Sequence, residues 1–167
     1  MILIGIGANL PSVHGSPRET CEAALKELVR RGVAIVRASR WYESAPVPVS
    51  VQPRFVNGVA EVATGFSPRA LLALLHDIER AFGRVRGAPN AARTLDLDLL
   101  DYDGMVVSEP GGLELPHPRM AARAFVLLPL AEIAPEWRHP VSKMTVTQLI
   151  GGLQNGQEVR LLAPENT

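Results

Sequence analysis

The sequence predicts an α+β fold in which helices pack on a mainly antiparallel sheet. Three observations support this class: two helical patterns each begin at a Ser-Pro pair, four stretches have the composition of strands, and the two kinds of pattern alternate. The expected order is strand, helix, strand, strand, helix, strand, with a hairpin and further helices behind it. A chain of 167 residues fits one domain, which we expect over residues 1–167 with a loosely held tail after about residue 154.

The first strand and the first helix have clear signals. Residues 2–7 form an apolar run that is typical of a buried strand. The segment Ser16–Glu19 reads Ser-Pro-Arg-Glu, which is a capping box with proline at the first helical position. We expect this helix to stop at Gly32. Its expected buried face consists of Cys21, Ala24, Leu25, Leu28 and Val29.

Two strands are expected between the helices. Residues 33–42 are rich in β-branched and aromatic residues, and a second strand is expected over residues 55–64. The three prolines from Ser44 to Pro53 predict a loop between these strands. On the second strand Phe55 and Asn57 fall on the same face, because successive side chains alternate.

The second helix precedes the last strand of the core. Ser67-Pro68 begins this helix, and we expect Gly83 to end it. Its apolar face consists of Leu71, Leu74, Leu75, Ile78 and Phe82. Residues 95–102 then alternate leucines with acids, which predicts a strand with one buried face. The resulting order, βαββαβ with helices on one face, is the ferredoxin-like plan.

An extension follows this core. Asp103-Gly104 predicts a tight hairpin turn into residues 105–107. A helix is expected over residues 123–134, with an interruption at Pro129. The ferredoxin-like plan hosts enzymes, regulatory modules and RNA-binding domains alike, so the fold by itself does not decide the function.

Composition and charge argue against several classes of protein. The chain carries 17 basic and 17 acidic residues, and this balance argues against general affinity for nucleic acid or an anionic membrane. No apolar run approaches the roughly eighteen residues that span a bilayer, and the N-terminus lacks a positive leader. The single cysteine, Cys21, cannot form an internal disulfide, and Gly5-x-Gly7 lacks the third glycine of a dinucleotide-binding turn. We expect a cytoplasmic protein.

The most informative feature is the acidic pair Asp96 and Asp98 inside the apolar run of residues 95–100. On a strand both carboxylates point to the face opposite the leucines. Two like charges on a half-buried strand repel each other and lose hydration, so a compensating group is expected. Oxygen ligands favour a hard divalent cation such as Mg²⁺, although a bare pair of this kind is more often a solvated acidic edge.

Basic residues surround the acidic pair in the sequence. A first group precedes it in a segment without acidic residues, and a second group follows it near an expected helix start. The first group is Arg80, Arg84, Arg86 and Arg93, and the second is His117, Arg119 and Arg123. Arginine forks donate parallel hydrogen bonds to phosphate oxygens. Together with a carboxylate pair for a metal, these groups predict a polyphosphate site.

At this point the sequence resembles the 6-hydroxymethyl-7,8-dihydropterin pyrophosphokinase family of folate biosynthesis, in its stand-alone form. The segment Arg93–Leu100 reads Arg-Thr-Leu-Asp-Leu-Asp-Leu-Leu, with Gly83–Arg86 before it and Leu115–His117 after it. The likeness extends from Gly5–Leu10 to Glu132–Pro135, nearly the whole chain. The resemblance implies transfer of pyrophosphate from ATP to the pterin hydroxymethyl oxygen, with release of AMP.

The resemblance also implies roles for the charged residues. Asp96 and Asp98 would hold two Mg²⁺ ions that bridge the triphosphate, as in other two-metal sites. The catalytic group would be completed by Arg84, Arg86 and Arg93. The nucleotide would be bound by His76, Glu79, Arg84, Arg93, His117 and Arg123.

For the pterin, the resemblance implies a flat ring stacked between Phe55 and Phe125. Asn57 offers both a donor and an acceptor for the amide-like edge of the ring. Backbone groups around Ser44, Pro46 and Val47 would bind the remaining ring nitrogens. The expected partners are therefore ATP and the pterin, with no nucleic acid and no membrane, and we expect a monomer.

The likeness is weakest at residues 87–92, where the family has a longer segment with an Arg-Trp pair that acts as a lid. A shorter loop without these side chains favours slower turnover. Two alternatives follow: a weakly active or inactive relative that binds nucleotide or pterin, and a non-enzymatic ferredoxin-like module that binds RNA or regulates. The acids at 96 and 98 argue against RNA, because they repel a phosphate backbone.

Overall fold

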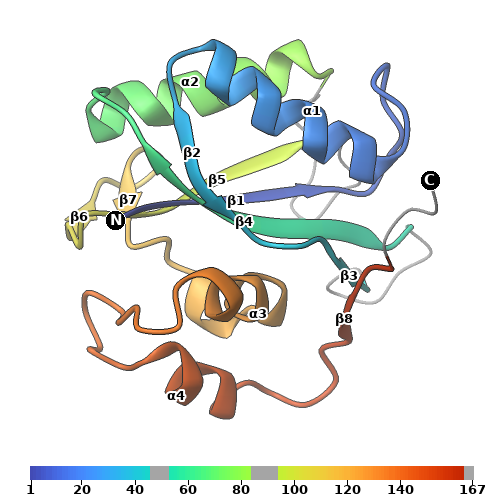
Figure 1. The fold of residues 1–167 in the computed structure, drawn as a ribbon. Coiled ribbons are helices and arrows are strands. Elements are labelled where there is room, and N and C mark those ends of the chain that lie inside the picture. Colours follow the sequence, from blue (N-terminus) through green and yellow to red (C-terminus); the bar gives the residue numbers. More distant parts are fainter. Residues whose placement is uncertain (46–52, 84–93, 164–167) are drawn as a thin grey trace.

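A sheet lies between two layers of helices (Figure 1). The structure is a computed structural model that describes residues 1–45, 53–83 and 94–163. The strands are β1 (Ile2–Ala8), β2 (Ala34–Ala38), β3 (Tyr42–Ser44), β4 (Phe55–Ala63), β5 (Asp96–Tyr102), β6 (Val107–Ser108), β7 (Glu114–Leu115) and β8 (Val159–Leu161). The helices are α1 (Pro17–Arg30), α2 (Pro68–Ala81), α3 (Ala124–Ile133) and α4 (Val146–Gly151), with a 3₁₀ turn at Met120–Ala122.

The main sheet has the strand order β5-β1-β4-β3-β8, and β2 also pairs with β4. Each of these pairs is antiparallel. Helices α1 and α2 follow the first and third core strands and lie together on one face (Figure 1). The α+β, ferredoxin-like plan is therefore confirmed.

Alternation along the strands divides the buried residues between two cores. Ile4 of β1 and Leu97 of β5 pack on the face covered by α1 and α2. Leu3 and Leu100 pack on the opposite face, against α3. Because side chains alternate along a strand, Asp96 and Asp98 share the α3 face with Leu100. This face carries the candidate site.

Both helix caps have the expected chemistry. The Ser16 side chain accepts a hydrogen bond from the Glu19 N–H in a full capping box, and the Ser67 side chain accepts one from the Ala70 N–H at the start of α2. The buried face of α1 differs by one position from the prediction. Val29 is 56% exposed, whereas Thr20 is fully buried.

The expected single strand over residues 33–42 is wrong, because β2 and β3 are separated at residues 39–41. At this break the Trp41 ring packs against the backbone of Gly58 on β4. The Ser39 hydroxyl accepts a hydrogen bond from the Val59 N–H at 3.0 Å. The ring occupies space that a side chain at position 58 would need, so the break depends on a residue across the sheet.

Gly58→Ala is expected to lower the free energy of unfolding by about 1–3 kcal/mol. A Cβ at this position would lie 2.6 Å from the Trp41 ring, which is buried and cannot move aside cheaply. Gly65→Ala is the matched control, because a Cβ there meets no atom within 4 Å. Urea denaturation of both variants provides the measurement. Equal stabilities of the two variants would contradict this account of the break.

The hairpin after β5 is also different from the prediction. The turn at Asp103-Gly104 forms, with φ of 52° and 73° and a 3.0 Å hydrogen bond from the Met105 N–H to the Tyr102 carbonyl. The following residues do not fold back on β5. Instead β6 pairs with β7 in a separate two-stranded sheet.

Helix α3 continues through Pro129, so the expected interruption is wrong. Pro129 has no backbone N–H, so the hydrogen bond that this position would donate to the Phe125 carbonyl is missing. Pro129 is buried, as are Leu127 and Leu130 of the same helix, and this burial offsets the loss.

Residues 157–161, in the segment where we expected a loose tail, contact the body of the protein. Strand β8 pairs with β3 as the last strand of the sheet (Figure 1). The Gln157 side chain accepts from the Ala124 N–H at 2.9 Å and donates to the Ala122 carbonyl at 3.0 Å. Within the described ranges, none of the helices is long and apolar enough to cross a membrane.

Candidate active site

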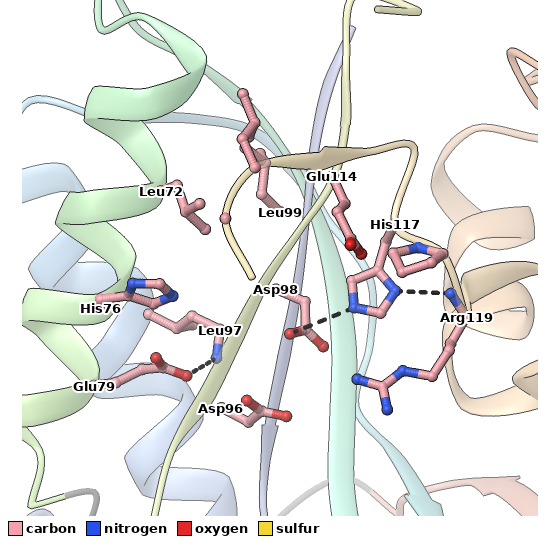
Figure 2. A pocket seen from close by; sticks show the side chains of 13 residues that line it. Leu72, His76, Glu79, Asp96, Leu97, Asp98, Leu99, Glu114, His117 and Arg119 are labelled. Carbon is pink, nitrogen blue, oxygen red and sulfur yellow. Dashed lines mark hydrogen bonds and ion pairs between the residues drawn. The ribbon is translucent and has the colours of Figure 1, made fainter. Parts of the chain in front are cut away.

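Asp96 and Asp98 lie on β5 as predicted, with their side chains on the α3 face of the sheet. Both are half-buried, whereas the alternating Leu95, Leu97 and Leu99 are buried among the residues of the α1–α2 core. The acids line a pocket bounded by α2 on one side and residues 112–119 on the other (Figure 2). Compensation of their charge is therefore required at the pocket wall or by a ligand.

His117 faces the acids from the opposite wall. Its Nε2 lies 3.9 Å from Asp98 Oδ1, and its ring points toward that carboxylate in Figure 2. The His117 N–H donates to the Leu100 carbonyl at 2.9 Å, which ties this wall to β5. The Arg119 N–H donates to Nδ1 at 3.2 Å. Because Nδ1 accepts, a neutral ring carries its proton on Nε2, toward Asp98.

The environment keeps this ring neutral at neutral pH. Burial lowers the pKa of His117 to about 4, and the positive charges of Arg123 and Arg119 act in the same direction, while Asp96 opposes them. At pH 7 the imidazole beside Asp98 is consequently neutral, so the two side chains do not form an ion pair. A neutral histidine can donate to a phosphate oxygen without charge repulsion of a metal ion.

We expect the protein to lose stability as the pH falls from about 6.5 to about 4. The unfolded chain binds a proton at His117 over this range, and the folded chain does not because its pKa is about 4. The free energy of unfolding should fall by up to about 1.4 kcal/mol per pH unit from this group. Denaturant titrations of the protein and of His117→Asn at several pH values test this. Parallel pH profiles for the two proteins would contradict it.

Helix α2 forms the other wall through His76 and Glu79 (Figure 2). Glu79 is only 3% exposed, and its Oε2 accepts a hydrogen bond from the Leu97 N–H at 2.9 Å. This N–H belongs to the residue between the two acids, and β5 is the last strand at its end of the sheet. Glu79 thus accepts a hydrogen bond from a backbone N–H of the edge strand β5, and this bond holds β5 against α2.

On β4, Asn57 lies in the same face of the sheet as the acids. Its Nδ2 donates to the Ser44 hydroxyl at 2.7 Å, and the two residues are 6% and 2% exposed. Phe55 is half-buried two residues earlier on the same face. The register pairs Gly7 of β1 with Asn57 on one side and with Asp96 on the other. The Asn57 amide and the Asp96 carboxylate therefore lie on either side of strand β1, at a position where β1 has no side chain.

The start of α3 contributes Arg123 and Phe125. The guanidinium carbon of Arg123 lies 5.3 Å from the centre of the Phe125 ring, a cation–π distance. Phe125 is half-buried and packs against the core below the sheet. In the part of the chain that the structure describes, Phe55 and Phe125 make no ring contact with each other.

Several predicted site residues lie outside the described ranges. They are Pro46, Val47, Arg84, Arg86 and Arg93, together with the loop of residues 87–92. The structure also adds pocket residues that the sequence did not single out, namely Leu72 and Glu114, and it places Arg119 of the second basic group in the pocket. No sequence signal marked Glu114, because it lies on β7 and the pairing of β6 with β7 was not predicted.

The donor set suits a metal ion that is shared with a substrate. No cluster of three His, Cys, Asp or Glu side chains with metal-binding geometry occurs among the residues described. Mg²⁺ characteristically binds through one or two carboxylates plus substrate phosphates and water, rather than in an all-protein cage. Asp96 and Asp98 on one face of β5 fit that mode of binding.

A pair of carboxylates, a neutral histidine and neighbouring arginines on a ferredoxin-like sheet define a site of the kind that binds a metal–nucleotide complex. Comparison with known proteins gives the family. Residues 3–135 match the model of 7,8-dihydro-6-hydroxymethylpterin-pyrophosphokinase (HPPK), so the chain belongs to the HPPK family.

Individual relatives agree with this assignment. The chain is 40% identical to the 2-amino-4-hydroxy-6-hydroxymethyldihydropteridine pyrophosphokinase of Synechocystis sp. over 149 residues, 89% of this chain and 73% of the relative. It is 43% identical to that of Pseudomonas aeruginosa over 140 residues, 83% of each chain. The crystal structure of HPPK-DHPS from Plasmodium falciparum matches with a TM-score of 0.66 at 15% identity, over 90% of this chain and 43% of that chain. This last likeness concerns the fold.

Proposed function

We propose that the protein transfers the pyrophosphoryl group of ATP to the hydroxymethyl oxygen of 6-hydroxymethyl-7,8-dihydropterin in folate biosynthesis. The pterin oxygen forms a bond to the β-phosphorus, the bond from that phosphorus to the α,β-bridging oxygen breaks, AMP leaves, and the hydroxyl proton is released. The observation that carries the proposal is the shared sheet face of the acidic pair and the Ser44–Asn57 amide, in a chain of the HPPK family.

Asp96 and Asp98 would hold two Mg²⁺ ions with the triphosphate. When bound, the ions would neutralise negative charge on the phosphates, which is the main requirement of phosphoryl transfer. Their carboxylates face the pocket from one strand, and Glu79 fixes that strand from behind. The chain's own contribution is thus a pair of fixed oxygens at one edge of the sheet.

The nucleotide would lie in the pocket between α2 and residues 112–119, beside His76 and Glu79. His117 would donate its Nε2 proton to a phosphate oxygen, and Arg123 would add positive charge from the start of α3. By family resemblance, further phosphate contacts would come from Arg84, Arg86 and Arg93.

The pterin would lie over β4, with Phe55 and Phe125 stacked on its two faces. Asn57 would bind its amide-like edge, oriented by the hydrogen bond to Ser44. Backbone groups at Ser44, Pro46 and Val47 would complete the recognition of the ring. The partial exposure of both phenylalanines supports this placement, because neither side chain is enclosed in the core.

We further propose that the chain acts as a single-domain monomer in the cytoplasm. The charge balance of 17 basic and 17 acidic residues supports small-molecule substrates rather than nucleic acid.

The direct test is formation of AMP by the purified protein. AMP should appear only when ATP, Mg²⁺ and 6-hydroxymethyl-7,8-dihydropterin are all present, with one AMP for each pterin pyrophosphorylated. Omission of the pterin is the essential control, because it separates pyrophosphoryl transfer from ATP hydrolysis. Tight ATP binding without AMP formation would instead identify an inactive relative.

A further inference from the structure

Gly7 occupies the middle of the candidate site. It pairs with Asn57 of β4 and with Asp96 of β5. Residues paired directly across antiparallel strands project to the same face of the sheet. The Asp96 and Asn57 side chains therefore rise from strands about 10 Å apart, on either side of Gly7.

The backbone conformation does not explain why glycine stands here. Gly7 lies inside a regular strand, and it is absent from the glycines with positive φ in the described chain. Any residue can adopt such an extended conformation. The reason must therefore lie in the space above the strand.

That space is filled by the amide of Asn57. A Cβ at position 7 would lie 2.8 Å from Asn57 Oδ1, closer than side chains approach in folded proteins. The other end of the same amide, Nδ2, donates to the Ser44 hydroxyl at 2.7 Å. The orientation of the Asn57 amide thus depends on two features. Its Nδ2 donates to Ser44 of β3, and its Oδ1 lies where a side chain at position 7 of β1 would be.

We propose that Gly7 is a positioning and specificity-determining residue for the pterin. Its missing side chain keeps the Asn57 amide in the orientation bonded to Ser44, and it leaves the gap between Asn57 and Asp96 open. In the proposed function, on which this inference rests, the hydroxymethyl group must cross that gap to reach the phosphate.

Gly7→Ala should raise the Kd for 6-hydroxymethylpterin roughly tenfold or more, because the displaced amide loses its hydrogen bond to the ring edge. The Kd for a non-hydrolysable ATP analogue with Mg²⁺ should stay within about twofold of the unmodified protein, a selectivity that general loss of structure would not produce. The fold should persist, since the crowded atom is the end of a rotatable side chain. Calorimetric titration measures both affinities.

Gly5→Ala is the matched control. Gly5 lies two residues earlier on the same strand, and the atom nearest to a Cβ there would be Leu100 Cδ1, at an ordinary 3.5 Å. Both affinities should remain within about twofold in this variant. An equal loss of pterin affinity in Gly5→Ala and Gly7→Ala would overturn the proposal.

A double-mutant cycle identifies the amide as the cause. In an Asn57→Ala background Oδ1 is absent, so adding Gly7→Ala should change the pterin Kd by less than about twofold. The double variant lacks Asn57 Oδ1, the atom that a Cβ at position 7 would approach. It therefore keeps the test possible if Gly7→Ala alone does not fold. Additive losses would overturn the proposal.

Failure of this inference is distinct from failure of the proposed function. If the unmodified protein forms pterin-dependent AMP and Gly7→Ala binds pterin equally well, only the role of Gly7 is overturned. If the unmodified protein neither binds the pterin nor forms AMP, both proposals fall together.

Discussion

Asp98→Ala should lower kcat for AMP formation by about 10²–10³, and Asp96→Ala should do the same. Each variant would remove one carboxylate that holds metal at the phosphates. The fold should remain intact, because both side chains are half-buried and directed into the pocket. Kinetic assays and urea denaturation measure the two effects.

Asp77→Ala is the control for these variants. Asp77 lies on the exposed surface of α2, where it pairs with Arg80. Its loss should leave kcat within about twofold. If either pocket variant retained turnover within tenfold of the unmodified protein, the metal-binding role of that residue would be wrong.

Glu79→Ala should lower the free energy of unfolding by about 2–4 kcal/mol and reduce kcat as well. The substitution leaves the Leu97 N–H without the carboxylate that accepts its hydrogen bond, and it opens a cavity beneath the pocket. The strand that carries Asp96 and Asp98 would then lose its anchor to α2. Denaturant unfolding and AMP assays together provide the measurement.

Glu79→Gln separates the hydrogen bond from the charge. Glutamine keeps an acceptor oxygen at nearly the same position, so this variant should recover more than half of the stability lost in Glu79→Ala. An alanine variant as stable as the unmodified protein would show that the carboxylate does not anchor β5. A glutamine variant no better than alanine would show that charge, not acceptance from Leu97, is the contribution.

Local chemistry made much of the fold predictable. The caps at Ser16 and Ser67 use side chains that lie within three residues of their targets, so the sequence contains the whole interaction. The alternation of leucines and acids on β5 likewise assigned the two faces of that strand before its partners were known. Such signals depend on neighbours in the sequence and not on the final sheet.

Features that depend on distant partners were not predictable in this way. The break between β2 and β3 depends on Trp41 packing over Gly58 of another strand. The side chains of β8 are half-buried or exposed, because this strand joins the sheet mainly through backbone hydrogen bonds. Backbone pairing at a sheet edge leaves little trace in side-chain composition.

The candidate site shows the same division. The residue types at Asp96 and Asp98 indicated metal chemistry from the sequence alone, and family resemblance indicated Asn57. The distance between the acid and the amide, however, is fixed by the register that pairs Gly7 with both. Register is a property of the assembled sheet, so the role of a glycine between two functional side chains could only follow from the structure.

The pairing of β8 with β3 has a consequence for biosynthesis of the enzyme. Arg160 and Glu43 on these strands are 117 residues apart in the chain, yet they form an ion pair. Synthesis must therefore reach residue 161 before β8 can pair with the free edge of β3. Until then β3 is an unprotected edge that can pair with another nascent chain, and contacts between such distant residues form slowly. Messages truncated before codon 159 should consequently yield aggregating polypeptides rather than a partly functional enzyme.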